Sequence, residues 1–264
     1  MTHSVVKQRI DPWSQLEQEL DEWVSSKRMA TLWWRDDDAV KPGQKLDRLI
    51  ELTSDTGLLL AVIPVRAANS LARLLNDFPH VQIAQHGYAH ENHAPRGQGS
   101  GAWELGMHRS EEVVLNDLAN GRERLEELFG SLFIPVVVPP WNRIAPELLI
   151  PIAARGYKGV SAFGPANLSV TPSELIIANA HCDPIRWKNG AMFAGESKTI
   201  SQLVAHLESR RCGQPGPDEH TGFLTHHIDL DGAGWEFCSR LSTVINEHPG
   251  ARWISPTSVF GVSA

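Results

Sequence analysis

The sequence predicts an α/β fold, a distorted (β/α) barrel formed as a single domain from parallel strands with outer helices. Short apolar runs alternate with longer amphipathic stretches along the chain, as in strand–helix units. The short runs are continuously apolar, which is typical of strands covered on both faces. Seven or eight such units in 264 residues favour one barrel. An open doubly wound sheet is the alternative.

The individual elements follow from local signals. Asp11-Pro12, a capping residue and a first-turn proline, predicts that residues 1–29 form an N-terminal helix that packs on a barrel of residues 30–264. Strands are predicted at residues 30–34, 58–63, 81–84, 133–138, 159–162, 175–178, 222–225 and 252–254. Helices are predicted at residues 46–52, 68–75, 110–129, 146–154 and 235–245, and a capping-box match at 199–202 predicts the start of another.

Composition narrows the class of protein. The chain is 42% hydrophobic and 21% charged, which is ordinary for a globular protein. Its net charge of -7 argues against nucleic acid or an anionic membrane as a partner. The N-terminal residues lack the apolar region of a secretory signal, and no apolar stretch has the length of a membrane span. We expect a cytoplasmic protein whose three cysteines are free thiols, since they show no CxxC spacing.

Reactive side chains follow four of the predicted strands. Because the carboxyl ends of parallel strands meet at one face, these side chains are expected to converge. Three consecutive carboxylates are costly unless something neutralises them, and two histidines four apart can bind a metal ion. Each motif alone could be a solvated turn or loop, but their convergence predicts a metal-dependent hydrolase. The four segments are Arg35-Asp36-Asp37-Asp38, His86-Gly87-Tyr88-Ala89-His90, Pro139-Pro140-Trp141-Asn142-Arg143 and Thr225-His226-His227.

The order and spacing of these motifs resemble the polysaccharide deacetylase family, metal-dependent N- and O-deacetylases built on a distorted (β/α) barrel. The resemblance extends from about residue 30 to 260. It implies that Asp38, His86 and His90 bind the metal and that Asp37 is the general base. The sequence also permits the alternative register, in which Asp36 is the general base and Asp37 binds the metal.

The same resemblance assigns the remaining parts of the site. His226, in a Leu-x-His motif, matches the general acid, and Trp141 matches the aromatic residue whose backbone N–H helps to hold the oxyanion. The family arginine that orients the base is replaced here by Val138. We expect Arg35 or Arg143 to take over, since Arg35 lies two residues before Asp37 and faces the same side.

Three further features of the sequence bear on the site. Tyr88, between the two histidines, is a candidate for substrate contact. Asp183 is a candidate for the family's acidic fourth motif, although Asp-Pro is also a common turn. Residues 94–102, rich in glycine, are predicted to form a mobile loop over the site.

The expected activity is removal of an acyl group, acetyl foremost, from an amide of a sugar or small molecule. The resemblance implies one divalent metal ion, zinc foremost, with cobalt, nickel, iron or manganese as alternatives. The expected partner is a small molecule or oligosaccharide, and nine tryptophans suit stacking on sugars. The alternatives are another barrel metallohydrolase, such as an esterase or phosphoesterase, and a non-catalytic carbohydrate-binding barrel.

Overall fold

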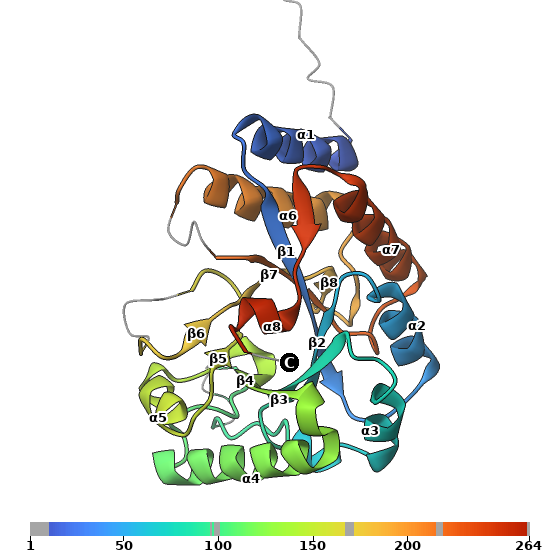
Figure 1. Cartoon of the computed structure of the whole chain (residues 1–264). Helices are drawn as coiled ribbons and strands as arrows, with labels where there is room; N and C mark the ends of the chain where they lie inside the picture. Colours follow the sequence, from blue (N-terminus) through green and yellow to red (C-terminus); the bar gives the residue numbers. More distant parts are fainter. Residues whose placement is uncertain (1–10, 96, 98–100, 167–171, 215–218, 263–264) are drawn as a thin grey trace, which may run out of the picture.

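A parallel sheet forms the centre of the computed structural model, which describes residues 11–95, 97, 101–166, 172–214 and 219–262 (Figure 1). Within these residues the strand order is β6-β5-β4-β3-β2-β1-β10-β7, and β11 pairs with β1. The strands of this sheet are β1 (Ala30–Ala39), β2 (Leu58–Val62), β3 (Val81–His86), β4 (Phe133–Val138), β5 (Gly159–Val160), β6 (Ile176–Ile177), β7 (Ala180–Cys182), β10 (Thr221–Thr225) and β11 (Ala251–Trp253).

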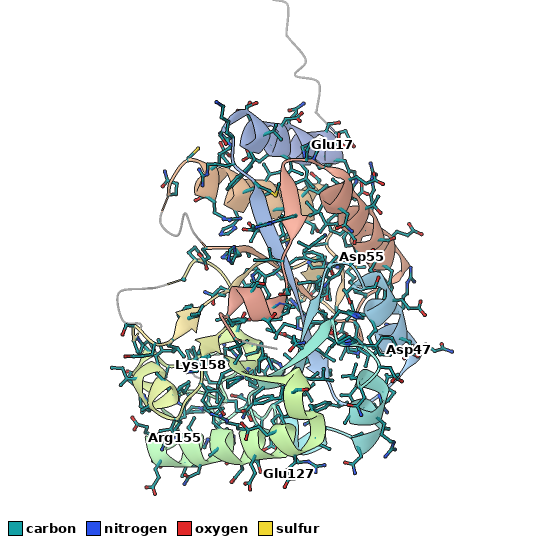
Figure 2. The ribbon with its side chains drawn as sticks, in the orientation of Figure 1. Glu17, Asp47, Asp55, Glu127, Arg155 and Lys158 are labelled. Carbon is teal, nitrogen blue, oxygen red and sulfur yellow. The ribbon has the colours of Figure 1, made fainter. Side chains whose placement is uncertain are left out.

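Helices surround the sheet, and charged side chains such as Glu17, Glu127 and Arg155 lie at the outer edge of this layer (Figure 2). The N-terminal helix packs on α6, where the indole of Trp13 donates to Glu196 and Arg211 pairs with Glu19. The helices are α1 (Pro12–Ser25), α2 (Gln44–Leu52), α3 (Asn69–Leu75), α4 (Glu111–Phe129), α5 (Leu149–Ala154), α6 (Glu196–Arg211), α7 (Gly232–Glu247) and α8 (Pro256–Val259).

The sheet closes on itself through the chain that follows β5. The N–H groups of Ala178 and Ala180 donate to the carbonyls of Val160 and Ala162, at 3.1 and 2.9 Å. Ala180 also pairs with Gly222 of β10, so β7 joins the β5 side of the sheet to β10 and β1. The predicted distorted (β/α) barrel is therefore confirmed, and its irregular closure is the distortion.

The alternation of side chains along β1 divides the core into an inner and an outer part. Trp33 points into the barrel and meets the ring of Phe260 edge-on, with ring centroids 5.8 Å apart. Trp34 points outward, between the sheet and its helices, where it packs on Trp253 and Phe223. Two adjacent tryptophans are thus both buried because helices cover the outer face of the strand.

The structure confirms one of the two helix starts predicted from capping residues and contradicts the other. The Asp11 cap is confirmed, because its carboxylate accepts from the N–H of Ser14. The capping box at residues 199–202 is wrong: α6 begins at Glu196 after Gly195, and the Thr199 hydroxyl donates to the Gly195 carbonyl within the helix. The hairpin of β8 (Ile185–Arg186) and β9 (Met192–Phe193) was not predicted, since two-residue strands carry little periodicity.

Two further expectations concern covalent and membrane structure. All three cysteines are free, with Cys182 and Cys238 buried and Cys212 exposed. Among the residues that the structure describes, no helix has both the length and the apolar character to cross a membrane. The stretch at residues 94–102, predicted as a mobile loop, falls partly outside the described residues.

A second group of potential metal ligands lies near the amino-terminal ends of the strands and consists of His181, His206 and Glu219. The two imidazole rings stack nearly parallel with centroids 3.5 Å apart, and one nitrogen of each lies within 4.8 Å of the other and of a Glu219 oxygen. The N–H of Gly222 donates to Nδ1 of His181, which puts the proton of the neutral ring on Nε2. Nε2 of His181 lies 3.2 Å from a Glu219 oxygen, and Nδ1 of His206 lies 3.0 Å from the Thr221 hydroxyl, so the group links α6 to the barrel.

We predict that His206 makes the fold sensitive to acid. Its pKa is lowered to about 3, because burial disfavours the charged ring and His181 and Arg210 add positive charge nearby. The unfolded chain binds this proton near its ordinary pKa of about 6.5, so stability present above that pH is lost as the pH falls toward 3. The decrease in Tm from pH 7.5 to 5 should be smaller for His206→Gln than for the wild type. Equal decreases would contradict the assignment.

Candidate active site

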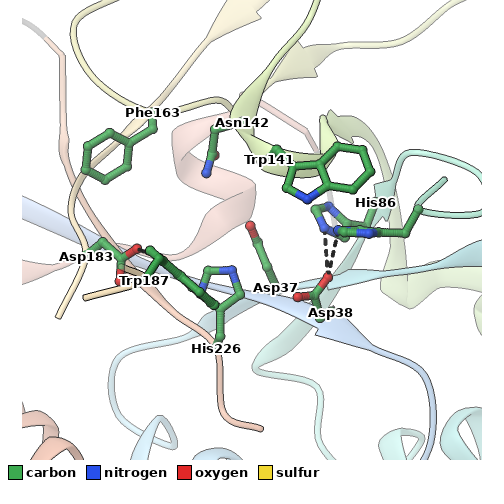
Figure 3. A pocket seen from close by; sticks show the side chains of 10 residues that line it. Asp37, Asp38, His86, Trp141, Asn142, Phe163, Asp183, Trp187 and His226 are labelled. Atoms are coloured by element: carbon green, nitrogen blue, oxygen red, sulfur yellow. Dashed lines mark hydrogen bonds and ion pairs between the residues drawn. The ribbon is translucent and has the colours of Figure 1, made fainter. Parts of the chain in front are cut away.

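The carboxyl ends of the strands surround a pocket of about 550 Å³ (Figure 3). Its walls come from the ends of β1 and β3 and from the chain after β3, β4, β5, β7, β8 and β10. The motifs that follow separate strands in the sequence thus meet in one place. The lining residues are Asp37, Asp38, His86, His90, Trp141, Asn142, Phe163, Asp183, Trp187 and His226.

An irregularity at the end of β1 brings two adjacent carboxylates into this pocket. Neighbours on a regular strand point to opposite faces. Here the register with β2 shifts between Asp36 and Ala39, and Asp38 has a left-handed backbone, with φ of +71°. The bulge turns Asp38 to the same side as Asp37. The carboxylate of Asp36 lies instead against His227, so the structure places Asp38 at the histidines.

Asp38, His86 and His90 form a compact group of three potential metal ligands. Oδ1 of Asp38 lies 3.1 Å from Nε2 of His86 and 3.3 Å from Nε2 of His90 (Figure 3). Burial by itself would raise the pKa of Asp38, but the contact with His86 and the positive charge of the histidines outweigh it and hold the pKa well below its usual range. Asp38 is therefore ionised at neutral pH.

The protonation of His86 suits a metal ion. Its Nδ1 lies 3.0 Å from the carbonyl of Val138, which can only accept, so this nitrogen carries a proton. Nε2, the other ring nitrogen, faces Asp38 Oδ1; burial alone would lower the pKa of His86, but this contact with Asp38 raises it. A cation, either the ring proton or a metal ion in its place, fits between Nε2 and Oδ1, and the backbone contact is the outer support typical of metal-binding histidines.

Arg35 and Asp37 form a buried ion pair inside the barrel. Nε of Arg35 lies 3.0 Å from one carboxylate oxygen and its Nη2 3.1 Å from the other. The guanidinium also donates to the backbone carbonyl and hydroxyl of Ser161 and to the side chain of Asn142. Both side chains are almost fully buried. The two-point contact fixes the plane of the carboxylate, which a single charge would not do.

His226 lies at the end of β10, on the other side of Asp37 from His86 in Figure 3. The ring is largely buried, and the indole of Trp187 meets it edge-on at 4.7 Å. Asp183 lies at the same end of the pocket, where it accepts hydrogen bonds from the Trp187 indole and the N–H of Ile185. Burial raises the pKa of Asp183, although the positive charge of His226 opposes this.

The other predicted site residues lie at different distances from the pocket. Trp141 lines it and packs its ring on His90 at 4.5 Å. Arg143 turns away, toward the carbonyl of Ala102 and the ring of Trp103. Within the described part of the chain, the side chain of Tyr88 is not among those that line the pocket. Of the two arginines, Arg35 is therefore the one that meets the carboxylate of Asp37.

Glu104 is a buried residue that sequence reasoning missed. Its carboxylate accepts hydrogen bonds from the N–H groups of Tyr88, Ala89 and Glu91. These groups belong to the turn between and beyond the two histidines, in which His90 has a left-handed backbone with φ of +59°. The only signal in the sequence was a lone acid in a glycine-rich stretch, which usually indicates a solvated loop. Glu104 holds this strained turn in place.

Comparisons with known proteins support the same architecture. No protein-family model and no curated protein sequence matches the chain. A proposed polysaccharide deacetylase from Mycobacterium smegmatis superposes with a TM-score of 0.63 at 15% identity, over 88% of this chain and 89% of that one. The chain has the fold of the polysaccharide deacetylases.

Two further structures share this deacetylase fold. The peptidoglycan N-acetylglucosamine deacetylase Bc1960 has a TM-score of 0.54 at 17% identity, over 92% of this chain and 97% of that one. A family 4 acetyl xylan esterase from Clostridium thermocellum, in complex with a cobalt ion, has a TM-score of 0.52 at 12% identity, over 88% and 93% of the two chains.

We predict that Glu104 sets metal affinity without touching the metal. In Glu104→Gln an NH₂ group replaces one acceptor oxygen. This group cannot accept a hydrogen bond, so it faces the backbone N–H groups of the turn donor to donor. Zn²⁺ affinity, measured against a competing chelator, should fall about 10- to 100-fold, as is usual for outer-shell changes. Glu91→Gln is the matched control, because it removes an exposed carboxylate from the same turn but keeps its backbone. Equal affinity of Glu104→Gln and the wild type would contradict the role.

Proposed function

We propose that this protein is a metal-dependent hydrolase that removes an acyl group, acetyl foremost, from an amide of a sugar or another small molecule. One observation carries the proposal: a three-ligand group, an arginine-held carboxylate and a buried histidine share one pocket. In this arrangement the three-ligand group would hold the metal that activates water, the carboxylate would remove a proton, and the histidine would donate one. The fold shared with deacetylases and an esterase supports the same reaction class.

Asp38, His86 and His90 would hold the metal ion. One carboxylate oxygen and two imidazole nitrogens suit Zn²⁺, and Co²⁺, Ni²⁺, Fe²⁺ and Mn²⁺ accept the same donors. When bound, the ion supplies a Lewis acid that polarises a carbonyl and lowers the pKa of water. The cobalt ion in the acetyl xylan esterase structure supports a divalent metal on this fold.

Asp37 would act as the general base. It lies next to Asp38 in the chain and lines the same pocket, but it is held by Arg35 rather than by the histidines. Each carboxylate oxygen has more than one lone pair, so the contact with Arg35 leaves acceptor capacity toward the pocket. The base is therefore oriented before substrate arrives, which reduces the cost of reaching the transition state.

His226 would protonate the departing nitrogen. An amide anion is a very poor leaving group, so amide cleavage requires this proton. Imidazole is suited to the task because its ordinary pKa is close to neutrality. The backbone N–H of Trp141, at the rim of the pocket, would help to hold the developing oxyanion.

The rim of the pocket supports a sugar or another flat-faced substrate. Trp187 is 48% exposed and Phe163 is 41% exposed, although both are large apolar side chains. Exposed rings at the mouth of a pocket can stack on the apolar face of a sugar. None of the described residues that line the pocket is a lysine or an arginine, which disfavours a phosphoester substrate. An ester of the same acyl group is the second candidate, because the acetyl xylan esterase shares the fold.

We predict that substitutions of Asp37 and Asp38 have different effects, on kcat and on metal binding respectively. Asp38→Ala and His86→Ala should lose the metal, measured by elemental analysis after reconstitution with Zn²⁺. Asp37→Asn should keep one metal ion per chain and lose kcat by about 10²- to 10⁴-fold, the usual contribution of a general base. The probe is N,N′-diacetylchitobiose, with release of acetate as the readout. Loss of metal from Asp37→Asn would show that the assignment of roles is wrong.

We predict that Arg35 is required for turnover but not for metal binding. Lysine keeps the charge but cannot make the two-point contact, so Arg35→Lys should lower kcat about 10- to 100-fold at unchanged metal content. Arg143→Lys is the matched control and should change kcat less than about threefold, since Arg143 contacts Trp103 rather than Asp37. Similar losses in the two variants would contradict a specific role for Arg35.

A further inference from the structure

Two residues beside the proposed catalytic groups are not explained by that mechanism. Asp36 is the first of three consecutive acids, and His227 follows the proposed general acid. Asp36 is fully buried on the outer side of β1, on the face opposite Asp37. His227 is buried as well, and its Nδ1 lies 2.5 Å from Oδ1 of Asp36. A buried ion pair next to two catalytic residues needs a structural or functional reason.

The carboxylate of Asp36 ties the end of β1 to the end of β10. The two strands pair in parallel, with Asp36 opposite Thr225. Oδ2 of Asp36 accepts from the Thr225 hydroxyl at 2.7 Å and from the backbone N–H of His227 at 2.8 Å. The indole of Trp34 donates to the same hydroxyl at 2.9 Å. The residues before and after His226 are therefore both bonded to one carboxylate.

The ring of His226 has no comparable support of its own. Its Nδ1 is buried, and no described group forms a hydrogen bond with it. Its close ring contact is the edge of Trp187, an apolar contact that does not fix a proton-donating direction. The position of the ring is therefore set by its backbone, and Asp36 holds the residues on both sides of it, through the Thr225 hydroxyl and the His227 N–H.

We propose that Asp36 and His227 are a positioning pair that sets the place of His226 for proton donation. This inference rests on the proposed function. Neither residue needs to touch the substrate. The buried carboxylate accepts three hydrogen bonds, one from a charged or polar ring, and such a network holds the chain segment in one arrangement.

His227 is the better residue to change, because Asp36 is two residues from a proposed metal ligand. In His227→Leu the ring is replaced by an apolar side chain of similar size, so the hydrogen bond to Oδ1 is lost. In His227→Asn the side-chain amide can occupy the place of Nδ1 and donate to Asp36. The two variants therefore differ in one donor at the same position.

The experiment measures how the loss of kcat in each variant depends on the leaving group of the substrate. Amide cleavage in N,N′-diacetylchitobiose needs the general acid, whereas 4-nitrophenyl acetate releases a stable phenolate that does not. We expect His227→Leu to lower kcat for the amide about 30-fold and kcat for the aryl ester less than threefold, with metal content unchanged. His226→Ala should show the same split, and His227→Asn should recover most of the amide activity. A purely structural defect would lower both activities together.

A second measurement separates this inference from the proposed function. A crystal structure of His227→Leu should show His226 displaced from its place beside Trp187. An undisplaced ring, or equal losses on both substrates, would overturn the positioning role. If the metal-loaded wild type cleaved neither probe, the proposed function would fail for these acetyl compounds, and the place of His226 in the variant would still decide the positioning role.

Discussion

Three consecutive carboxylates at the end of β1, two of them fully buried and Asp38 partly buried, are the constraint on which the rest of the site depends. A buried carboxylate is expensive unless it is paired and hydrogen-bonded. Each of the three carboxylates is paired with a different partner. Asp36 contacts His227, Asp37 contacts Arg35, and Asp38 contacts His86 and His90. The bulge that turns Asp38 into the pocket allows these partners to come from different sides of the strand.

The barrel provides these partners at fixed positions. β3 and β10 both end at the same face as β1, and they supply the histidines on either side of it. The backbone is strained where these groups converge, since Asp38, His90, Trp141 and Asn142 all have left-handed φ values between +54° and +71°. Such strain persists only where the surrounding structure holds it, as the carboxylate of Glu104 does for the turn that carries His90.

Much of this arrangement could be predicted because periodicity and strand order are local properties. Apolar runs predicted the main strands, and the rule that parallel strands end at one face brought distant motifs together. The prediction that Arg35 faces the same side as Asp37 needed only the two-residue period of a strand. Short strands and helix starts were less predictable. The predicted capping box at residues 199–202 lies inside α6, because the helix already begins at Glu196 with Gly195 as its N-cap.

The sequence by itself determined the fold class and the set of reactive side chains, because both are recorded in spacing along the chain. Only the tertiary structure decided which carboxylate meets which partner. The choice between two registers of the Asp run depended on the bulge after Asp36, and the choice of Arg35 over Arg143 depended on where each guanidinium points. The contacts of Glu104 and His227 were equally hidden, because their partners are backbone and side-chain groups that sequence spacing does not bring together.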